Sequence, residues 1–159
     1  MKIKKVVSSV IYNGPSMLDG KPIIVVGIIT SNNAKTGNML QTHIIRSDIN
    51  PIVASKTGED YSICGDCVHK GTATNSPDKK TAVGRSCYVN LGQGPRQVFE
   101  RFKRGGYPVI EHEEITRLGH NRMIRLGTYG DPSAVPSEIW ELLLKSSRGH
   151  TGYTHQHNA

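Results

Sequence analysis

Three cysteines and one histidine lie close together in the sequence and carry the side chains that bind thiophilic metals. Cys64 and Cys67 are separated by two residues, so both sulfurs can reach one metal from a tight turn, and Cys87 supplies a third thiolate. His69 is the fourth predicted ligand. With His69 included, the residues predict a closed structural zinc site. The three cysteines alone instead suit an iron–sulfur cluster with one open position.

The number and placement of the cysteines argue against two other roles. A thioredoxin-like redox pair precedes a helix in a βαβ unit, whereas Cys64 and Cys67 lie in a turn followed by a polar loop. An odd total of three cysteines does not fit a secreted disulfide framework. No apolar segment is long enough for a signal peptide or a transmembrane helix. We therefore expect a cytoplasmic protein that does not enter a membrane.

The chain has a formal net charge of +7 and a pI near 9.5, which favours an acidic partner. Nucleic acid is the commonest partner of such a basic protein. A basic helix is predicted to begin at Pro95, because proline suits the first helical turn. The cations of this helix are the predicted nucleic-acid contacts: Arg96, Arg101, Lys103 and Arg104. A merely solvated basic face is the alternative interpretation.

The elements that must position these residues are predicted to form a single domain over residues 1–159. A chain of this length can bury a core without a disulfide or a metal. Residues 1–62 are predicted to form N-terminal strands and loops. Residues 63–90 form the segment with the metal ligands, called here the cysteine segment, and residues 91–155 form helices and a C-terminal βαβ unit. The β-branched run from Ile23 to Ile29 predicts a strand buried on both faces.

The C-terminal third has the pattern of a βαβ unit. A strand over residues 121–129, a helix from Pro136 and a final strand over residues 151–155 predict a small layered sheet of the α/β class. Functional residues of such sheets lie at the carboxyl ends of the strands. Asp131 and His155 are predicted to lie at two of these ends and are therefore the catalytic candidates. Asp131 could position a substrate or a divalent ion, or it could cap the turn after the strand. A histidine near a chain end can equally be an exposed residue.

Five blocks of the sequence together resemble an uncharacterised family of small phage-encoded proteins. The blocks are Lys35–Thr42, Cys64–Cys67, Cys87–Asn90, Arg125–Pro132 and Gly152–Gln156. The last third is also similar to the end of larger phage proteins that carry cysteine clusters and are suspected relatives of radical enzymes. Cys87 followed by Tyr88 resembles the aromatic residue beside the last cysteine of radical S-adenosylmethionine enzymes, although those enzymes hold their three cysteines in one compact loop. The resemblance implies a phage origin and brings no established activity with it.

These observations lead to three hypotheses from different classes. The first is a phage accessory protein with a zinc site of three cysteines and one histidine that binds nucleic acid or a host protein. The second is an iron–sulfur enzyme similar to the radical S-adenosylmethionine enzymes. The third is an inhibitor of a host defence protein or of host machinery. In each case we expect the protein to act in the cytoplasm of the infected host cell.

Overall fold

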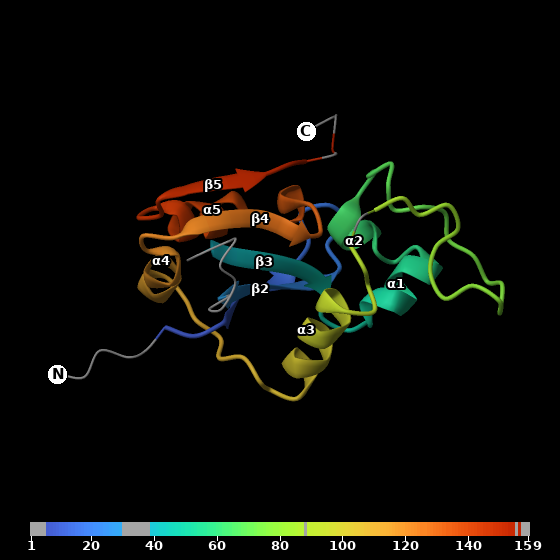
Figure 1. Ribbon diagram of the computed structural model, residues 1–159, viewed down its shortest axis with the longest axis horizontal. Helices are drawn as coiled ribbons and strands as arrows, with labels where there is room; N and C mark the ends of the chain where they lie inside the picture. Colours follow the sequence, from blue (N-terminus) through green and yellow to red (C-terminus); the bar gives the residue numbers. More distant parts are fainter. Residues whose placement is uncertain (1–5, 30–38, 88, 155, 157–159) are drawn as a thin grey trace.

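A five-stranded mixed sheet forms the centre of the described chain (Figure 1). The computed structural model describes residues 6–29, 39–87, 89–154 and 156. The strand order is β1-β2-β3-β4-β5; β1, β2 and β3 are antiparallel neighbours, whereas β3, β4 and β5 run parallel. The strands are β1 (Ser9–Pro15), β2 (Pro22–Ile29), β3 (Met39–Arg46), β4 (Met123–Tyr129) and β5 (Gly149–Gly152). The predicted α/β class is confirmed.

The helices occupy the two connections between the parallel strands. The connection from β3 to β4 contains α1 to α4 together with the cysteine segment, and the connection from β4 to β5 contains η1 and α5. The helices are α1 (Pro51–Thr57), α2 (Tyr61–Cys64), α3 (Gly94–Lys103), α4 (Glu113–Gly119), the 3-10 helix η1 (Pro132–Ala134) and α5 (Ser137–Leu144). Parallel β4 and β5, joined through η1 and α5, form the predicted C-terminal βαβ unit.

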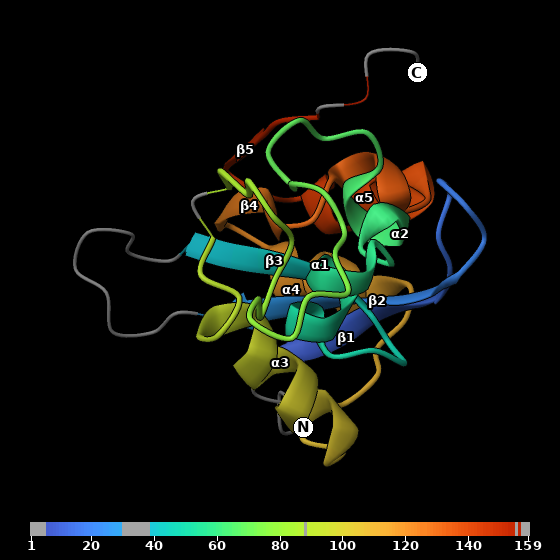
Figure 2. The same cartoon turned by 90° about the vertical axis from the view of Figure 1, so that its right-hand side faces the viewer.

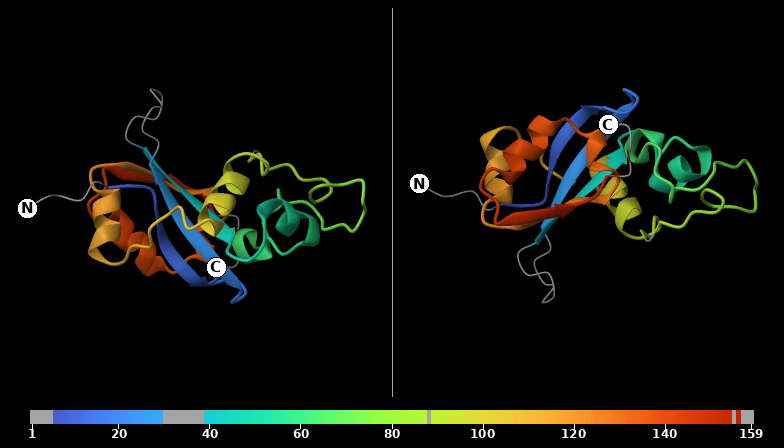
Figure 3. Two further views of the ribbon diagram at one scale, coloured as in Figure 1. Left: turned by 90° about the horizontal axis from the view of Figure 1, so that it is seen from below. Right: turned by 90° about the horizontal axis from the view of Figure 1, so that it is seen from above.

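The strand β2 lies in the core, as its unbroken β-branched run predicts. Residues Ile23–Val26 are fully buried. Figure 3 shows α4 and α5 on one side of the sheet and α3 on the other. Leu118 of α4 packs so closely on β2 that a Cβ atom at Gly27 would come within 2.9 Å of it. Val98 and Phe99 of α3 belong to the same hydrophobic cluster, so helices on both sides of the sheet bury it.

The two C-terminal strands are shifted relative to the prediction. β4 begins at Met123 rather than at residue 121, and β5 ends at Gly152 rather than at residue 155. The last pairing between the two strands joins Leu126 to Gly152. Beyond Gly152, Oγ1 of Thr154 donates a hydrogen bond at 3.1 Å to Oδ2 of Asp131, which follows the end of β4.

The carboxyl ends of β3, β4 and β5 all point toward the cysteine segment. In Figure 1 the arrowheads of these strands are directed at α2 and the green loops that follow it. Figure 2, viewed from that side, shows the same loops in front of the sheet. The fold therefore places the metal-ligand candidates at the edge where α/β sheets bind ligands. No helix of the described ranges is long and apolar enough to cross a bilayer.

Candidate metal and ligand site

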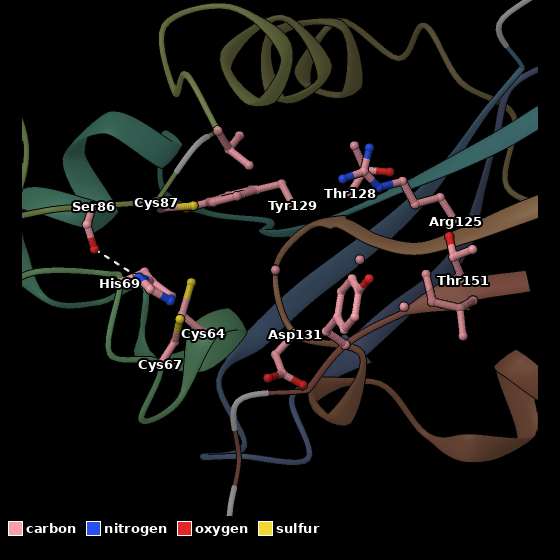
Figure 4. Close-up of a pocket in the computed structure, with 16 residues that line it drawn as sticks. Cys64, Cys67, His69, Ser86, Cys87, Arg125, Thr128, Tyr129, Asp131 and Thr151 are labelled. Carbon is pink, nitrogen blue, oxygen red and sulfur yellow. Dashed lines mark hydrogen bonds between the residues drawn. The ribbon is translucent and has the colours of Figure 1, made fainter. Parts of the chain in front are cut away.

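The cysteine segment and the parallel strands border a cavity of about 330 Å³, called here the site cavity (Figure 4). The side formed by the cysteine segment is the loop wall, which includes Cys64, Cys67, His69, Ser86 and Cys87. The side formed by β4, β5 and the residues directly after them is the strand wall, which includes Arg125, Thr128, Tyr129, Asp131, Thr151 and Tyr153. All four predicted metal ligands therefore share one wall of one cavity.

Two backbone turns bring the three cysteines to the loop wall. α2 ends at Cys64, and the N–H of Cys67 donates to the carbonyl of Cys64 at 3.2 Å, which closes the predicted turn. The carbonyl oxygen of His69 accepts hydrogen bonds from the N–H groups of Ser86 and Cys87 at 3.0 and 3.1 Å. These two bonds fold the intervening loop back on itself. Cys87 consequently lies on the same wall as Cys64 and Cys67 despite their separation in sequence.

All three cysteines are free thiols. Burial raises the pKa of Cys64 well above its ordinary value, and the neighbouring Asp60, Cys67 and Cys87 raise it further. Burial also raises the pKa of Cys67. The protein alone therefore keeps both thiols protonated near neutral pH, and a metal would have to displace these protons on binding.

The chemistry of these side chains suits a metal, but their arrangement does not form a metal cage. Three thiols and an imidazole are the donors that zinc and iron–sulfur clusters take. In the part of the chain that the structure describes, no three histidine, cysteine, aspartate or glutamate side chains are placed so that they could hold a metal ion. Binding would require these side chains to move closer together. Metal binding at Cys64, Cys67, His69 and Cys87 therefore stays a prediction.

The imidazole of His69 is oriented by the same loop that carries Cys87. Its Nδ1 lies 2.9 Å from Oγ of Ser86, the dashed contact in Figure 4. Metal-binding histidines are commonly oriented by such a bond at one ring nitrogen, with the other nitrogen directed at the metal. The contact is compatible with His69 as a fourth ligand.

Asp131 lies at a strand end as predicted and is only 4% exposed. Its Oδ1 accepts hydrogen bonds from the N–H and the hydroxyl of Ser133 at 2.9 and 2.8 Å, which caps η1. Its Oδ2 accepts from Oγ1 of Thr154 at 3.1 Å and from Nε2 of Gln156 at 3.2 Å. The structure thus shows the capping role, and a catalytic role of Asp131 stays a prediction. His155, the other catalytic candidate, lies outside the described residues.

Sequence reasoning did not assign Arg125, Thr151 or Tyr153 of the strand wall to the site. Arg125 of β4 and Thr151 of β5 are parallel partners in the sheet and both line the cavity. Tyr153, directly after β5, also lines it and is 83% exposed. The strand-end rule could have pointed to Tyr153. The pairing of Arg125 with Thr151 depends on strand register, for which the sequence offers no signal.

Two buried polar atoms beside the cavity have no hydrogen-bond partner among the described residues: Nη2 of Arg85 and Oγ1 of Thr128. Nη1 of the same arginine donates to the carbonyl oxygen of Cys87 at 3.4 Å. Buried polar groups are normally hydrogen-bonded. Both atoms are enclosed by protein, and Arg85 itself does not line the cavity.

Three of the predicted nucleic-acid contacts lie on α3 and the fourth, Arg104, is its C-cap; none of them lines the site cavity. All of them are exposed: Arg96, Arg101, Lys103 and Arg104. The guanidinium of Arg101 lies 4.7 Å from the ring centre of Tyr107, and its Nε donates to the carbonyl of Gly106 at 3.3 Å. Nζ of Lys103 lies 5.7 Å from the ring centre of Phe99. The exposed basic face is present, and its binding to nucleic acid stays a prediction.

The chain matches no protein-family model, and it has no significant match among curated proteins or solved structures.

Proposed function

We propose that this chain is a metalloprotein in which Cys64, Cys67 and Cys87 hold an iron–sulfur centre that faces the site cavity. The supporting observation is that the three thiols line a cavity of about 330 Å³ whose other wall is the carboxyl end of two parallel strands. A closed structural site surrounds its metal with protein ligands, whereas a site that performs chemistry keeps one position open. A cavity beside the thiols provides room for a ligand at such a position.

The strand wall supports a small polar ligand next to this centre. The Arg125 guanidinium and the Thr151 hydroxyl are hydrogen-bond donors on that wall, and Tyr153 offers an exposed ring on which a planar group can stack. Arg85 adds a positive charge beside Cys87, where thiolates bound to a metal would be negative. The similarity of Cys87-Tyr88 to radical S-adenosylmethionine enzymes agrees with this proposal.

A closed zinc site with His69 as fourth ligand is the competing interpretation, favoured by the contact between His69 and Ser86. Anaerobic purification followed by iron, sulfide and zinc analysis separates the two. We expect a brown protein with iron and acid-labile sulfide. A serine in place of any one of the three cysteines, Cys64, Cys67 or Cys87, should remove most of the iron, because a serine oxygen is a poor substitute for a thiolate. His69→Ala should retain it.

The matched control is Val68→Ala, which lies in the same turn, is 74% exposed and carries no donor atom. Its metal content should equal that of the wild type. A colourless protein with one equivalent of zinc that His69→Ala loses would replace the iron–sulfur proposal with the closed zinc site. Wild-type protein that takes up neither metal after anaerobic reconstitution would reject both.

A second candidate function is binding of nucleic acid by α3 and its C-cap residue, supported by four exposed cations: Arg96, Arg101, Lys103 and Arg104. The logarithm of the affinity falls with the logarithm of the salt concentration, and each phosphate contact that is lost should make this slope shallower by about 0.9 for duplex DNA. Fluorescence anisotropy with single-stranded and duplex oligonucleotides measures this slope for Arg96→Gln and Arg104→Gln.

The control for α3 is Lys79→Gln, a lysine exposed on the loop before Cys87. An affinity that does not change with salt would contradict the role of α3. Salt-resistant capture of one host protein, together with absent oligonucleotide binding, would favour the inhibitor hypothesis. The resemblance to phage-encoded proteins makes lysate of a bacterial host the material for that capture.

A further inference from the structure

The side chain of Gln156 connects the segment after β5 to the turn between Cys64 and Cys67. Its Nε2 donates to the carbonyl oxygen of Cys64 at 2.8 Å, and its Oε1 accepts from the N–H of Asp66 at 3.0 Å. One amide group thereby binds both an acceptor and a donor of the same short stretch of backbone. The turn that presents two of the three thiols is held from outside by a residue far away in the sequence.

Gly65 allows this close approach. A Cβ atom at Gly65 would lie 2.6 Å from both Cδ and Nε2 of Gln156, which is closer than real Cβ contacts come. The φ angle of Gly65 is 56°, in the left-handed region that favours glycine. Gly65 therefore suits the backbone of the turn, and a larger residue there would displace the amide of Gln156.

Asp131 holds the amide of Gln156 from the opposite side. Its Oδ2 accepts from Nε2 of Gln156 at 3.2 Å, and its own N–H donates to the carbonyl of Ile63 at 2.6 Å. Because Nε2 faces two acceptors and Oε1 faces one donor, the hydrogen bonds also determine which way round the amide lies. The end of β4, the segment after β5 and the end of α2 meet at this side chain.

We propose that Gln156 is a positioning residue of the thiol site: it holds the Cys64–Cys67 turn against the end of β4 so that both thiols stay on the wall of the site cavity. Cys87 is held by a different contact, the bond from its N–H to the carbonyl of His69. Loss of Gln156 therefore loosens Cys64 and Cys67 and spares Cys87. This inference depends on the proposed function in one respect only, the identity of the group that the thiols bind.

Pulsed alkylation of the reduced, metal-free chain with iodoacetamide tests this inference. Trypsin releases Cys64 and Cys67 on the peptide 57–70 and Cys87 on the peptide 86–96, so mass spectrometry follows the two groups separately. Gln156→Ala is expected to raise the alkylation rates of Cys64 and Cys67 by about five- to tenfold, the effect of about one net hydrogen bond. The rate of Cys87 should stay within about twofold, since its own backbone contact is unchanged.

Two further variants separate positioning from a general loss of structure. Gln156→Glu keeps an acceptor for the N–H of Asp66 but places a carboxylate against the carboxylate of Asp131, so it should accelerate labelling more than Gln156→Ala. Adding Asp131→Asn removes that repulsion and should recover part of the protection. Gln97→Ala, at an exposed glutamine of α3, is the matched control and should leave all three rates unchanged.

Equal acceleration of all three cysteines in Gln156→Ala, or no acceleration at all, would overturn the positioning role. The metal content of anaerobically reconstituted protein is measured in parallel. It distinguishes failure of the positioning role from failure of the proposed metal centre. Selective labelling in Gln156→Ala while the wild type takes up no metal rejects the metal centre alone. Full metal uptake by the wild type with unchanged labelling in Gln156→Ala rejects the positioning role alone.

Discussion

The strand wall of the site cavity rests on backbone pairing and a buried core, whereas the loop wall rests on a few individual hydrogen bonds. β4 has a paired strand on each side, and its Ile124 is fully buried. On the loop wall, the carbonyl of His69 holds Cys87 and the amide of Gln156 holds the turn at Cys64. The strand wall therefore supplies a fixed surface, while the loop wall can readjust its thiols around a bound group at a small cost in free energy.

The largest effect is expected from a cavity under the strand wall. Ile124→Ala removes buried side-chain volume from β4 and should lower the free energy of unfolding by about 2–5 kcal/mol. Urea denaturation followed by circular dichroism measures the loss. Val68→Ala on the exposed part of the cysteine segment is the control and should change stability by less than about 0.5 kcal/mol. Similar losses for both variants would contradict the contrast between the walls.

Substitution of Gly130, which connects β4 to Asp131, should have the next largest effect on the free energy of unfolding. Gly130 has a φ of 89°, and a Cβ atom there would lie 2.6 Å from Cβ of Ile44. Gly130→Ala combines backbone strain with overlap in the core, so it should cost about 2–4 kcal/mol. Gly20→Ala, with a φ of 76° and open space around the new methyl group, carries the strain alone and should cost about 1–2 kcal/mol. Equal losses in thermal denaturation would mean that the overlap is relieved by movement of Ile44.

The sheet beneath the strand wall should also respond to pH. His43 of β3 pairs with Tyr129, and burial lowers the pKa of His43 from 6.5 to about 4. Burial raises the pKa of Asp60 to about 6, and this acts in the opposite sense over the same range. Between pH 6.5 and 4 the unfolded chain binds a proton at His43 that the native state does not, so the contribution of His43 to stability falls as the pH drops. At about pH 4.5 this amounts to about 2–3 kcal/mol.

His43→Gln should remove this part of the pH dependence, which urea denaturation at a series of pH values measures. His150→Gln, at an exposed histidine of β5, is the matched control. A wild-type profile that His43→Gln leaves unaltered would show that other groups cause the acid sensitivity.

The smallest effect is expected on the loop wall. Ser86→Ala removes the hydroxyl that contacts Nδ1 of His69, but the contact is exposed to solvent. The free energy of unfolding should therefore change by less than about 0.5 kcal/mol, as thermal denaturation can verify. A loss of more than about 1 kcal/mol would mean that the loop wall is anchored more firmly than its hydrogen bonds indicate.

Several elements could be predicted because their signals are local. The run of β-branched residues from Ile23 predicted a buried strand, Pro95 predicted the start of a helix, and the C-terminal third predicted the βαβ unit. Local patterns report periodicity and chain breaks, which are properties of neighbouring residues. The boundaries of β4 and β5 were less accurate, because pairing between strands decides where each one ends.

The candidate site was predictable on its loop wall and, on the strand wall, at the strand-end residue Asp131. The donor set can be read from the sequence, because the side chains of Cys64, Cys67, His69 and Cys87 carry their chemistry wherever they lie. The residues that face those donors are known only from the folded chain. The partnership of Arg125 with Thr151 follows from strand register, and the amide of Gln156 reaches Cys64 from 92 residues away in sequence. Such contacts leave no trace in local sequence patterns, since they arise when the folded sheet brings distant segments to one edge.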